Sequence, residues 1–351
     1  MLIHSRPPLV AAALLFLLLG GGWLLAFGSN VLIPFALALV LWVLVNAIAG
    51  RLGRLLGRPR QETRALCLAV AILLLILALG FVVHLIITNV GAVSASATDY
   101  EAKLMALLPA LADELGLTPP TFAELLGLIE LDVWIRRIAG MMVTFTSNIG
   151  LVILYVAFLL LEQHMFDAKI DALCREPGQA AQVRQVLGQI ERRVERYLWI
   201  KTIFSIAVAL LSWCVLYVAG IANPGFWGLV VFLLNYIPVL GTFLGVLLPS
   251  LLALVQLASI GPTLLIALSL GVIQFSLGTV LEPRLMGRTL NLSPVVIVLS
   301  LAVWGGLWGV VGMFLCVPIM VMLTIAGGQI PATRPFAILL TADGRTDPGA
   351  G

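Results

Sequence analysis

Charged side chains are scarce in the second half of the chain, and those that occur are gathered in one stretch. Between Lys201 and Arg334 the only charged residues are Glu282, Arg284 and Arg288, and this range holds no histidine. The surrounding sequence is apolar, so these charges must lie at a membrane face or in a water-filled cavity. A carboxylate there can bind a coupling ion or form an ion pair. We predict that Glu282 pairs with Arg284 and fixes a loop at the membrane face.

A second group of ionisable residues, Glu162, His164 and Asp167, has the side chains of a metal site but not the spacing. A zinc-binding helix of the HExxH type needs two histidines four residues apart. We interpret the group as the polar end of a helix and predict no metal ion and no cofactor. The apolar segments also lack the Ser-His pair, facing aspartates or zinc motif of an intramembrane protease, so we predict that the protein is not an enzyme.

Neutral polar side chains and helix breaks remain as candidates for solute binding. From Thr202 to Leu281 no residue is ionisable except cysteine and tyrosine. Neutral donors and acceptors suit hydroxyl-rich solutes, which can satisfy them without burying a charge. The candidate solute path consists of Asn235, Thr242, Gln274, Ser276, Thr279 and Asn291, with backbone groups freed near Pro238, Gly241, Gly305, Gly306 and Gly309.

The composition places these candidates in a membrane protein. The 351 residues are 61% hydrophobic and 11% charged, whereas soluble domains contain roughly 25% charged residues. A net charge of +3 is too small to suggest nucleic-acid binding. We predict an all-α integral membrane protein in the lipid bilayer, with about six full spans plus two interrupted or re-entrant helical hairpins in inverted arrangement, or about eight spans by simple hydropathy.

Loop charges predict the orientation. The apolar runs 9–27 and 31–49 are separated by Gly28-Ser29-Asn30, which predicts a tight helical hairpin whose first span is retained rather than cleaved. A basic cluster follows, and such clusters mark the cytoplasmic side. We therefore predict that the cluster and both termini lie in the cytoplasm. The cluster consists of Arg51, Arg54, Arg58, Arg60 and Arg64.

Composition shifts divide the chain into six segments. We expect amphipathic helices outside the membrane in the second and fourth of them. The segments are 1–88 (spans one to three), 89–140 (extracytoplasmic amphipathic segment), 141–163 (span four), 164–200 (cytoplasmic amphipathic helix), 201–326 (transport core: span five, hairpin 1, span six and hairpin 2) and 327–351 (flexible cytoplasmic tail).

Two apolar segments of the transport core carry breaks. Residues 226–257 would form a helix of about 48 Å, too long for a bilayer of roughly 30 Å, and Asn235–Gly241 offers a turn in the middle. Residues 294–326 repeat this pattern with glycines at the centre. The charges at 282–288 place the two hairpins on opposite faces, as in the inverted repeats of secondary transporters, although ordinary paired spans would give the same loop orientations. Between them we expect span six to end at Glu282-Pro283, with a further break at Gly287.

The blocks NYIPVLGTFLGVLLPSLLAL (235–254) and LEPRLMGRTLNLSPVVIVLSLAVWGGLWGVVGMFLCVPIMV (281–321) resemble the signature blocks of the AI-2E family of bacterial transporters. The resemblance implies a homo-oligomeric protein of the bacterial inner membrane, expected as a pentamer, that moves its substrate by an elevator-like shift without ATP. It also maps the family's tight turn onto Asn235, Pro238 and Gly241, its post-helix motif onto Glu282, Pro283 and Gly287, and its closing glycines and proline onto Gly306, Gly309, Gly312 and Pro318.

The resemblance leaves two functions open. The first is export of small polar solutes by alternating access, with an autoinducer-2-like quorum-sensing signal as the candidate. The second is exchange of monovalent cations such as sodium for protons. Proton coupling usually needs an ionisable group at depth in the membrane, and the second half of the chain offers only Glu282 for this role.

Overall fold

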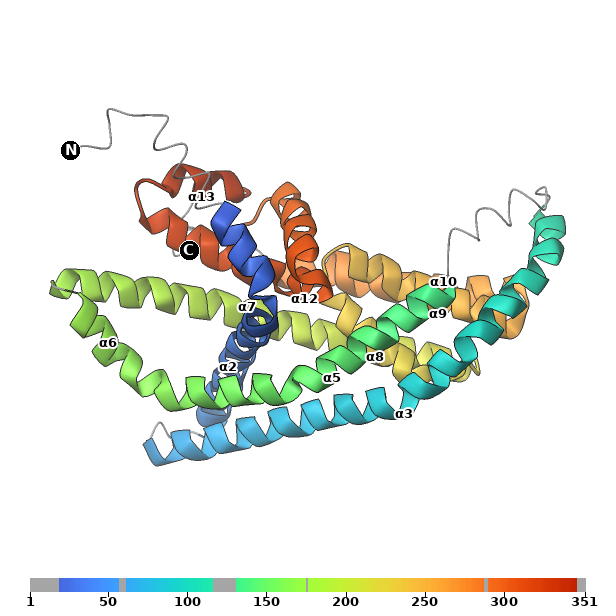
Figure 1. Ribbon diagram of the computed structural model, residues 1–351, viewed down its shortest axis with the longest axis horizontal. Helices are drawn as coiled ribbons and strands as arrows, with labels where there is room; N and C mark the ends of the chain where they lie inside the picture. The colour runs from blue at the N-terminus through green and yellow to red at the C-terminus, as the bar shows by residue number, and fades with distance from the viewer. Residues whose placement is uncertain (1–18, 57–60, 116–130, 175, 287–289, 346–351) are drawn as a thin grey trace. The chain divides into compact units, whose positions relative to one another are not determined.

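The computed structural model describes residues 19–56, 61–115, 131–174, 176–286 and 290–345 (Figure 1). These residues are almost entirely helical, and the β-type pairing among them is one antiparallel bridge between Leu292 and Thr341. Seven helices of this part of the chain are long and apolar enough to cross a bilayer. The prediction of an all-α integral membrane protein is therefore confirmed.

The helices of the described residues have the following bounds. In chain order they are α2 (Ser29–Leu55), α3 (Gln61–Leu115), α5 (Leu131–Glu162), the 3₁₀-helix η1 (Gln163–Met165), α6 (Phe166–Leu173), α7 (Pro177–Val218), α8 (Pro224–Asn235), α9 (Leu240–Leu257), α10 (Ile260–Gln274), the π-helix η2 (Phe275–Leu281), α11 (Glu282–Met286), α12 (Pro294–Gln329) and α13 (Arg334–Leu340).

The described residues fall into two compact units. The first unit draws on Met1–Trp42, Gly150–Ile190 and Asn291–Gly351, and the second on Val43–Ile149 and Glu191–Leu290. Helices α2, α5 and α7 each contribute residues to both units. The predicted transport core, 201–326, is divided at residue 290, because α8 to α11 belong to the second unit and α12 to the first.

The first unit is built on apolar packing between α2 and α5. Ala38 of α2 is fully buried beside Val152 and Val156 of α5, and Phe35 meets Tyr155 edge to ring at 5.7 Å. Apolar residues spaced three to four apart form a stripe on each helix, which explains why these faces meet.

The start of the chain does not form the predicted helical hairpin. Residues 19–27 are helical, and i→i−4 hydrogen bonds continue across Gly28, from its own N–H to Leu24 (2.8 Å) and from Leu32 to its carbonyl (2.9 Å). The chain therefore passes from residue 27 into α2 without reversing, and the prediction was wrong because a lone glycine can be accommodated inside a helix. Most of the first predicted span, 9–27, lies outside the described residues.

Helix α3 also differs from its predicted limits. It continues from Gln61 to Leu115, 55 residues, so span three and the start of the predicted amphipathic segment 89–140 are one helix. At 1.5 Å per residue this helix is about 82 Å long, much more than a bilayer of roughly 30 Å. Residues 116–130, with the Pro119-Pro120 pair, lie outside the described part of the chain.

The fourth predicted segment, 164–200, is likewise divided differently. Helix α6 ends at Leu173, and α7 then runs from Pro177 to Val218 without interruption. The amphipathic part and span five are therefore one helix of 42 residues. Hydropathy changes near residue 200, but the backbone does not break there, because Lys201 and Thr202 are compatible with a helix.

The core of the second unit surrounds α8 and α9. Phe226 and Trp227 of α8 are buried with Leu252 of α9, Leu270 of α10 and Ile86 of α3. Pro224 occupies the first turn of α8, where its missing N–H costs nothing. Helix α8 has 12 residues and α9 has 18, so α8 is shorter than the roughly 20 residues that cross a bilayer.

Helix α12 is broken where the glycines predict a break. Gly309 has φ 62° and ψ −143°, and Figure 1 shows two limbs of α12 meeting at a sharp bend. The chain doubles back so closely that a Cβ on Gly312 would lie 1.9 Å from the carbonyl oxygen of Trp304. The indole of Trp308 donates a hydrogen bond of 2.9 Å to the carbonyl of Leu25, which ties the bend to the N-terminal helix.

We expect Gly309→Ala to lower the free energy of unfolding by about 1–3 kcal/mol, because the backbone conformation at this position is accessible almost only to glycine. Thermal denaturation of the purified protein in detergent measures this. Gly306→Ala is the matched control, since Gly306 has ordinary φ and open space where its Cβ would lie. Equal losses in both variants would show that the bend does not depend on the conformation of Gly309.

Candidate functional site

The turn between α8 and α9 is tight and strained. Val239 has φ 63° and ψ −61°, and the N–H of Leu240 donates to the carbonyl of Pro238 at 2.6 Å. This is a classic-type γ-turn, which is rare, and positive φ is unfavourable for a β-branched residue. A Cβ on Gly241 would lie 1.8 Å from the carbonyl oxygen of Leu234, so only glycine fits there. The predicted interruption of hairpin 1 is thus present.

Two hydrogen bonds hold this turn against α7. The amide Nδ2 of Asn235 donates to the hydroxyl of Ser205 at 2.9 Å, and both residues are buried. The next residue, Tyr236, shares a hydrogen bond of 2.7 Å with the hydroxyl of Thr202. An amide buried in a membrane protein needs a partner, and the structure provides one to Asn235 from within the protein.

Glu282 makes a buried ion pair with Lys201, which lies beside Thr202 in the middle of α7. The Nζ–Oε1 distance is 2.6 Å, and the side chains are 9% and 8% exposed. The predicted pair between Glu282 and Arg284 is wrong, because residues two apart on a helix face different directions and Arg284 is exposed. Arg288 and Gly287 lie outside the described residues.

Span six does not end at Glu282-Pro283 as predicted. After α10 the chain widens into the π-helix η2, and α11 continues to Met286, just before Gly287. A π-helix already interrupts the i→i−4 ladder, so the missing N–H of Pro283 removes less hydrogen bonding here than in a regular helix. The proline was therefore a poor marker of the helix end.

Gln274 lies at the junction of α10 and η2 and faces α9. Its side chain is 1% exposed, and neither Oε1 nor Nε2 has a hydrogen-bond partner. A Cβ on Gly245 of α9 would lie 2.8 Å from Nε2, and one on Gly278 would lie 3.6 Å from Oε1 and 3.9 Å from the hydroxyl of Thr242. The structure therefore brings together two of the predicted path residues, Gln274 and Thr242.

The other candidates on this segment point elsewhere. Thr279 is exposed, and the hydroxyl of Ser276 donates to the carbonyl of Val272 on its own helix. Among the glycines of hairpin 2, Gly305 packs against Met313 of the same hairpin, whereas Gly306 and Gly309 have open space at their Cβ positions.

Asn291 is engaged with the C-terminal segment. Its Nδ2 donates to Oδ1 of Asp343 at 2.6 Å and to the carbonyl of Arg345 at 2.9 Å. Backbone hydrogen bonds join the same segments, from Ser293 to Leu340 and from Ala342 to Asn291. These contacts fix the start of α12, so the tail is ordered at least to residue 345. The hydrogen bond from the Asn291 amide, together with one from the N–H of Arg345, lowers the pKa of the Asp343 carboxyl.

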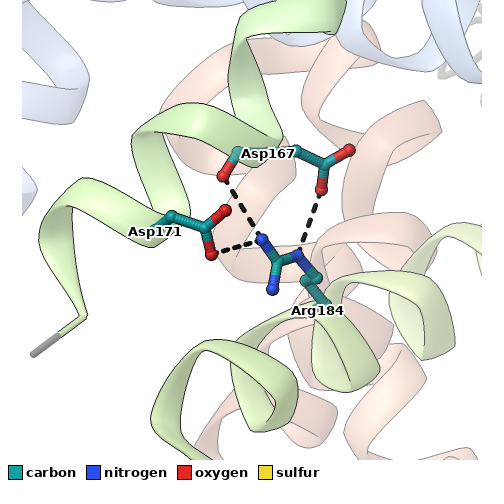
Figure 2. Close-up of polar contacts among 3 residues, drawn as sticks. All are labelled: Asp167, Asp171 and Arg184. Carbon is teal, nitrogen blue, oxygen red and sulfur yellow. Dashed lines mark hydrogen bonds and ion pairs between the residues drawn. The ribbon is translucent and has the colours of Figure 1, made fainter. Parts of the chain in front are cut away.

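The exposed ionic contacts of the first unit join α6 to α7 and to the end of α5. Figure 2 shows Arg184 between two aspartates, with its Nε 3.2 Å from Oδ1 of Asp167 and its Nη2 bonded to Asp171. Glu162 pairs with Lys169. Basic side chains therefore engage both carboxylates of the group first considered for metal binding. Because they are exposed, these pairs contribute little to stability and mainly orient α6 relative to α5 and α7.

The basic cluster is partly described. The guanidinium of Arg51 lies 3.8 Å above the ring of Trp199 and 4.0 Å from Glu195, which joins α2 to α7 by a cation–π contact. Arg54 donates to the carbonyl of Gly50 on its own helix, and Arg64 is exposed. Arg58 and Arg60 lie outside the described residues. The side of the membrane on which the cluster lies stays a prediction.

A family model described as AI-2E family transporter matches residues 11–332. The chain belongs to the AI-2E transporter family. The AI-2 transport protein TqsA of Escherichia coli (strain K12) is 28% identical over 323 residues, 90% of each chain. A protein of Haemophilus influenzae that is provisionally named a transport protein is 27% identical over 349 residues, which cover 96% of this chain and 97% of that protein.

A third AI-2E relative, the provisionally named transport protein YhhT of E. coli (strain K12), is 25% identical over 329 residues, 89% of this chain and 88% of its own. The predicted family is therefore confirmed. The chain is a multi-pass membrane transporter, and its family and relatives are named as transporters rather than enzymes.

Sequence reasoning missed several residues of this transporter's polar interior. From the sequence alone, Lys201 only borders the charge-free range, and Ser205 and Gly245 carry no prediction. The sequence does contain a pattern that indicates Lys201 and Ser205, because these two residues and Thr202 lie on one face of a helix in an otherwise apolar span. The pairing of Lys201 with Glu282, 81 residues away, could not be inferred from spacing.

Removing one partner of the buried ion pair leaves an uncompensated charge. We expect Lys201→Ala or Glu282→Gln to destabilise the protein by about 3–5 kcal/mol, and the double variant Lys201→Met/Glu282→Leu to recover most of this loss. Thermal denaturation in detergent compares them. Exposed Arg284→Ala should stay within about 0.5 kcal/mol of the wild type. Single variants as stable as the wild type would contradict the buried pairing.

The contact between Asn291 and Asp343 should respond to acid. Hydrogen bonds from the Asn291 amide, then from the Arg345 N–H, hold the pKa of Asp343 below its ordinary value of 3.8. Its contribution is therefore present above about pH 4 and is lost as the pH falls through the lowered pKa. The protection of residues 334–345 against hydrogen exchange, taken relative to the intrinsic exchange rate at each pH, should fall in that range. Asp343→Ala should show the lower protection at every pH, and a variant that keeps the acid-dependent step would contradict the assignment.

Proposed function

We propose that this AI-2E transporter exports small polar solutes across the bacterial inner membrane by elevator-like alternating access, with an autoinducer-2-like molecule as candidate substrate. The observation that supports this most is the unpaired amide of Gln274, buried against glycines of α9 and η2. Neutral hydrogen-bonding groups inside a membrane protein suit a neutral polar cargo. The relative TqsA is named an AI-2 transport protein, which suggests this signal for the first test.

The interrupted hairpins would form the moving part. The short helix α8 and the strained turn at Val239 support a re-entrant hairpin 1, since irregular backbone at membrane depth occurs only inside protein or beside water. The bend at Gly309 supports the same interpretation of hairpin 2. Interrupted membrane helices that offer free backbone groups to the cargo occur in several secondary transporters. We also propose that the transporter is a homo-oligomer, a pentamer by family resemblance, that both termini lie in the cytoplasm and that transport does not use ATP.

Inside-out vesicles provide the test of export. Vesicles that contain the protein should take up autoinducer-2 faster than vesicles without it, and they should do so without added ATP. Val239→Gly removes the strain at the turn without adding a side chain and should alter the transport rate while leaving the fold intact. Equal uptake by vesicles with and without the protein would refute export of this solute.

The buried Lys201–Glu282 pair favours one alternative, a monovalent cation/proton antiporter. A carboxylate buried in a membrane helix is a common site of proton coupling, and one oxygen of Glu282, Oε2, has no hydrogen-bond partner. The partner ammonium of Lys201 weighs against a metal cation binding at the same carboxylate, because like charges repel. The solute carrier therefore remains the leading proposal.

Sodium-dependent pH changes inside vesicles distinguish the two functions. An antiporter should show such changes in the wild type, and they should disappear in Glu282→Gln and in the stability-matched double variant Lys201→Met/Glu282→Leu. Arg284→Ala should behave as the wild type. Sodium-dependent pH changes that survive in the double variant would exclude Glu282 as the coupling group.

A further inference from the structure

Gln274 differs from the other buried polar side chains described in the second unit. The buried amide of Asn235 is bonded to Ser205, and the buried hydroxyl of Thr263, also on α10, donates to the carbonyl of Ser259 at 2.8 Å. The buried hydroxyl of Ser212 also has no hydrogen-bond partner, but a serine hydroxyl can rotate toward a carbonyl of its own helix. The amide of Gln274 is larger, holds two unpaired polar atoms and is 1% exposed.

An amide buried in this way destabilises the protein that carries it. Both the donor and the acceptor lose their hydrogen bonds to water, and neither gains one from protein. Native proteins keep few such groups, and those they keep call for a physical explanation. An isosteric apolar residue such as methionine would fill the same volume without this cost.

The surroundings of Gln274 fit a binding role. Its Nε2 lies against the bare backbone of Gly245, and its Oε1 faces Gly278, which also borders the hydroxyl of Thr242. No side chain from these two glycines covers the amide. Gln274 also immediately precedes the π-helix η2, and π-type turns inside α-helices occur frequently at functional sites.

We propose that Gln274 recognises the transported solute directly, donating a hydrogen bond from Nε2 and accepting one at Oε1, with the hydroxyl of Thr242 beside it. The inference rests on the proposed transport function and narrows its substrate class. An amide offers one kind of donor and one acceptor but no charge, so the preferred solute is neutral and carries hydroxyl or carbonyl groups. A charged solute would lose its hydration here without compensation.

The variant Gln274→Met tests this assignment. Uptake of autoinducer-2 into inside-out vesicles should show a KM raised about tenfold, the effect of losing one or two hydrogen bonds that bind the solute, with little change in the maximal rate. The same variant should have a Tm at least about 2 °C higher than the wild type, because it removes unpaired buried atoms. A merely structural role predicts the opposite change in Tm.

Two further variants keep the test independent of folding. Gly278→Ala leaves Gln274 in place but adds a methyl group 3.6 Å from its Oε1, an ordinary contact distance, so it should fold and should also raise KM. Thr263→Val is the matched control: it alters a buried polar residue of the same helix whose hydroxyl is already bonded, and it should leave KM unchanged.

Binding is measured separately from transport. Autoinducer-2 or ribose, added to the purified protein in detergent, should raise the Tm of the wild type and of Thr263→Val but not that of Gln274→Met. If this shift depends on Gln274 while vesicles show no uptake, the inference holds and the proposed transport of these solutes fails. The inference is overturned if Gln274→Met keeps the wild-type KM and Tm shift, or if neither solute shifts the Tm of the wild type.

Discussion

Hydrogen-bonding groups inside a bilayer cannot bond to water, so each needs a hydrogen-bond partner within the protein. The second unit of this transporter is arranged around that constraint. One face of α7 supplies an ammonium and two hydroxyls, and these meet the carboxylate of Glu282, the phenol of Tyr236 and the amide of Asn235. The turn of hairpin 1 and the start of α11 are thereby fixed to the same helix. Gln274 stands apart because its amide is left unpaired.

Glycines set the second constraint, because both hairpins fold back on themselves more tightly than a side chain permits. Gly241 and Gly312 each lie where a Cβ would meet a backbone carbonyl oxygen at less than the closest contact of real atoms. Such positions could be predicted from the sequence, since glycines and a proline interrupt apolar runs too long for one crossing. The interruption at Asn235–Gly241 and the bend at Gly309 were located in this way.

Other features depended on contacts that no local pattern records. The Gly28-Ser29-Asn30 motif and Glu282-Pro283 both suggest an end to a helix, yet the backbone stays helical through each of them. Local propensity is weak compared with the cost of leaving backbone groups unpaired in an apolar medium. In the same way, the buried pairing of Glu282 with Lys201 rather than with Arg284 depends on how α7 packs. Of the predicted solute path, Gln274 and Thr242 come together, whereas Asn291 is bound to the C-terminal segment.

Three continuous helices, α2, α5 and α7, belong partly to one unit and partly to the other. The chain therefore crosses from one unit to the other within a helix at each of these three places, and not within a loop. Gly150 lies at the division in α5, and Gly188 lies two residues before the division in α7. Glycine weakens a helix by about 1 kcal/mol relative to alanine. Helices α5 and α7 can therefore bend most easily near residues 150 and 188, close to the two divisions.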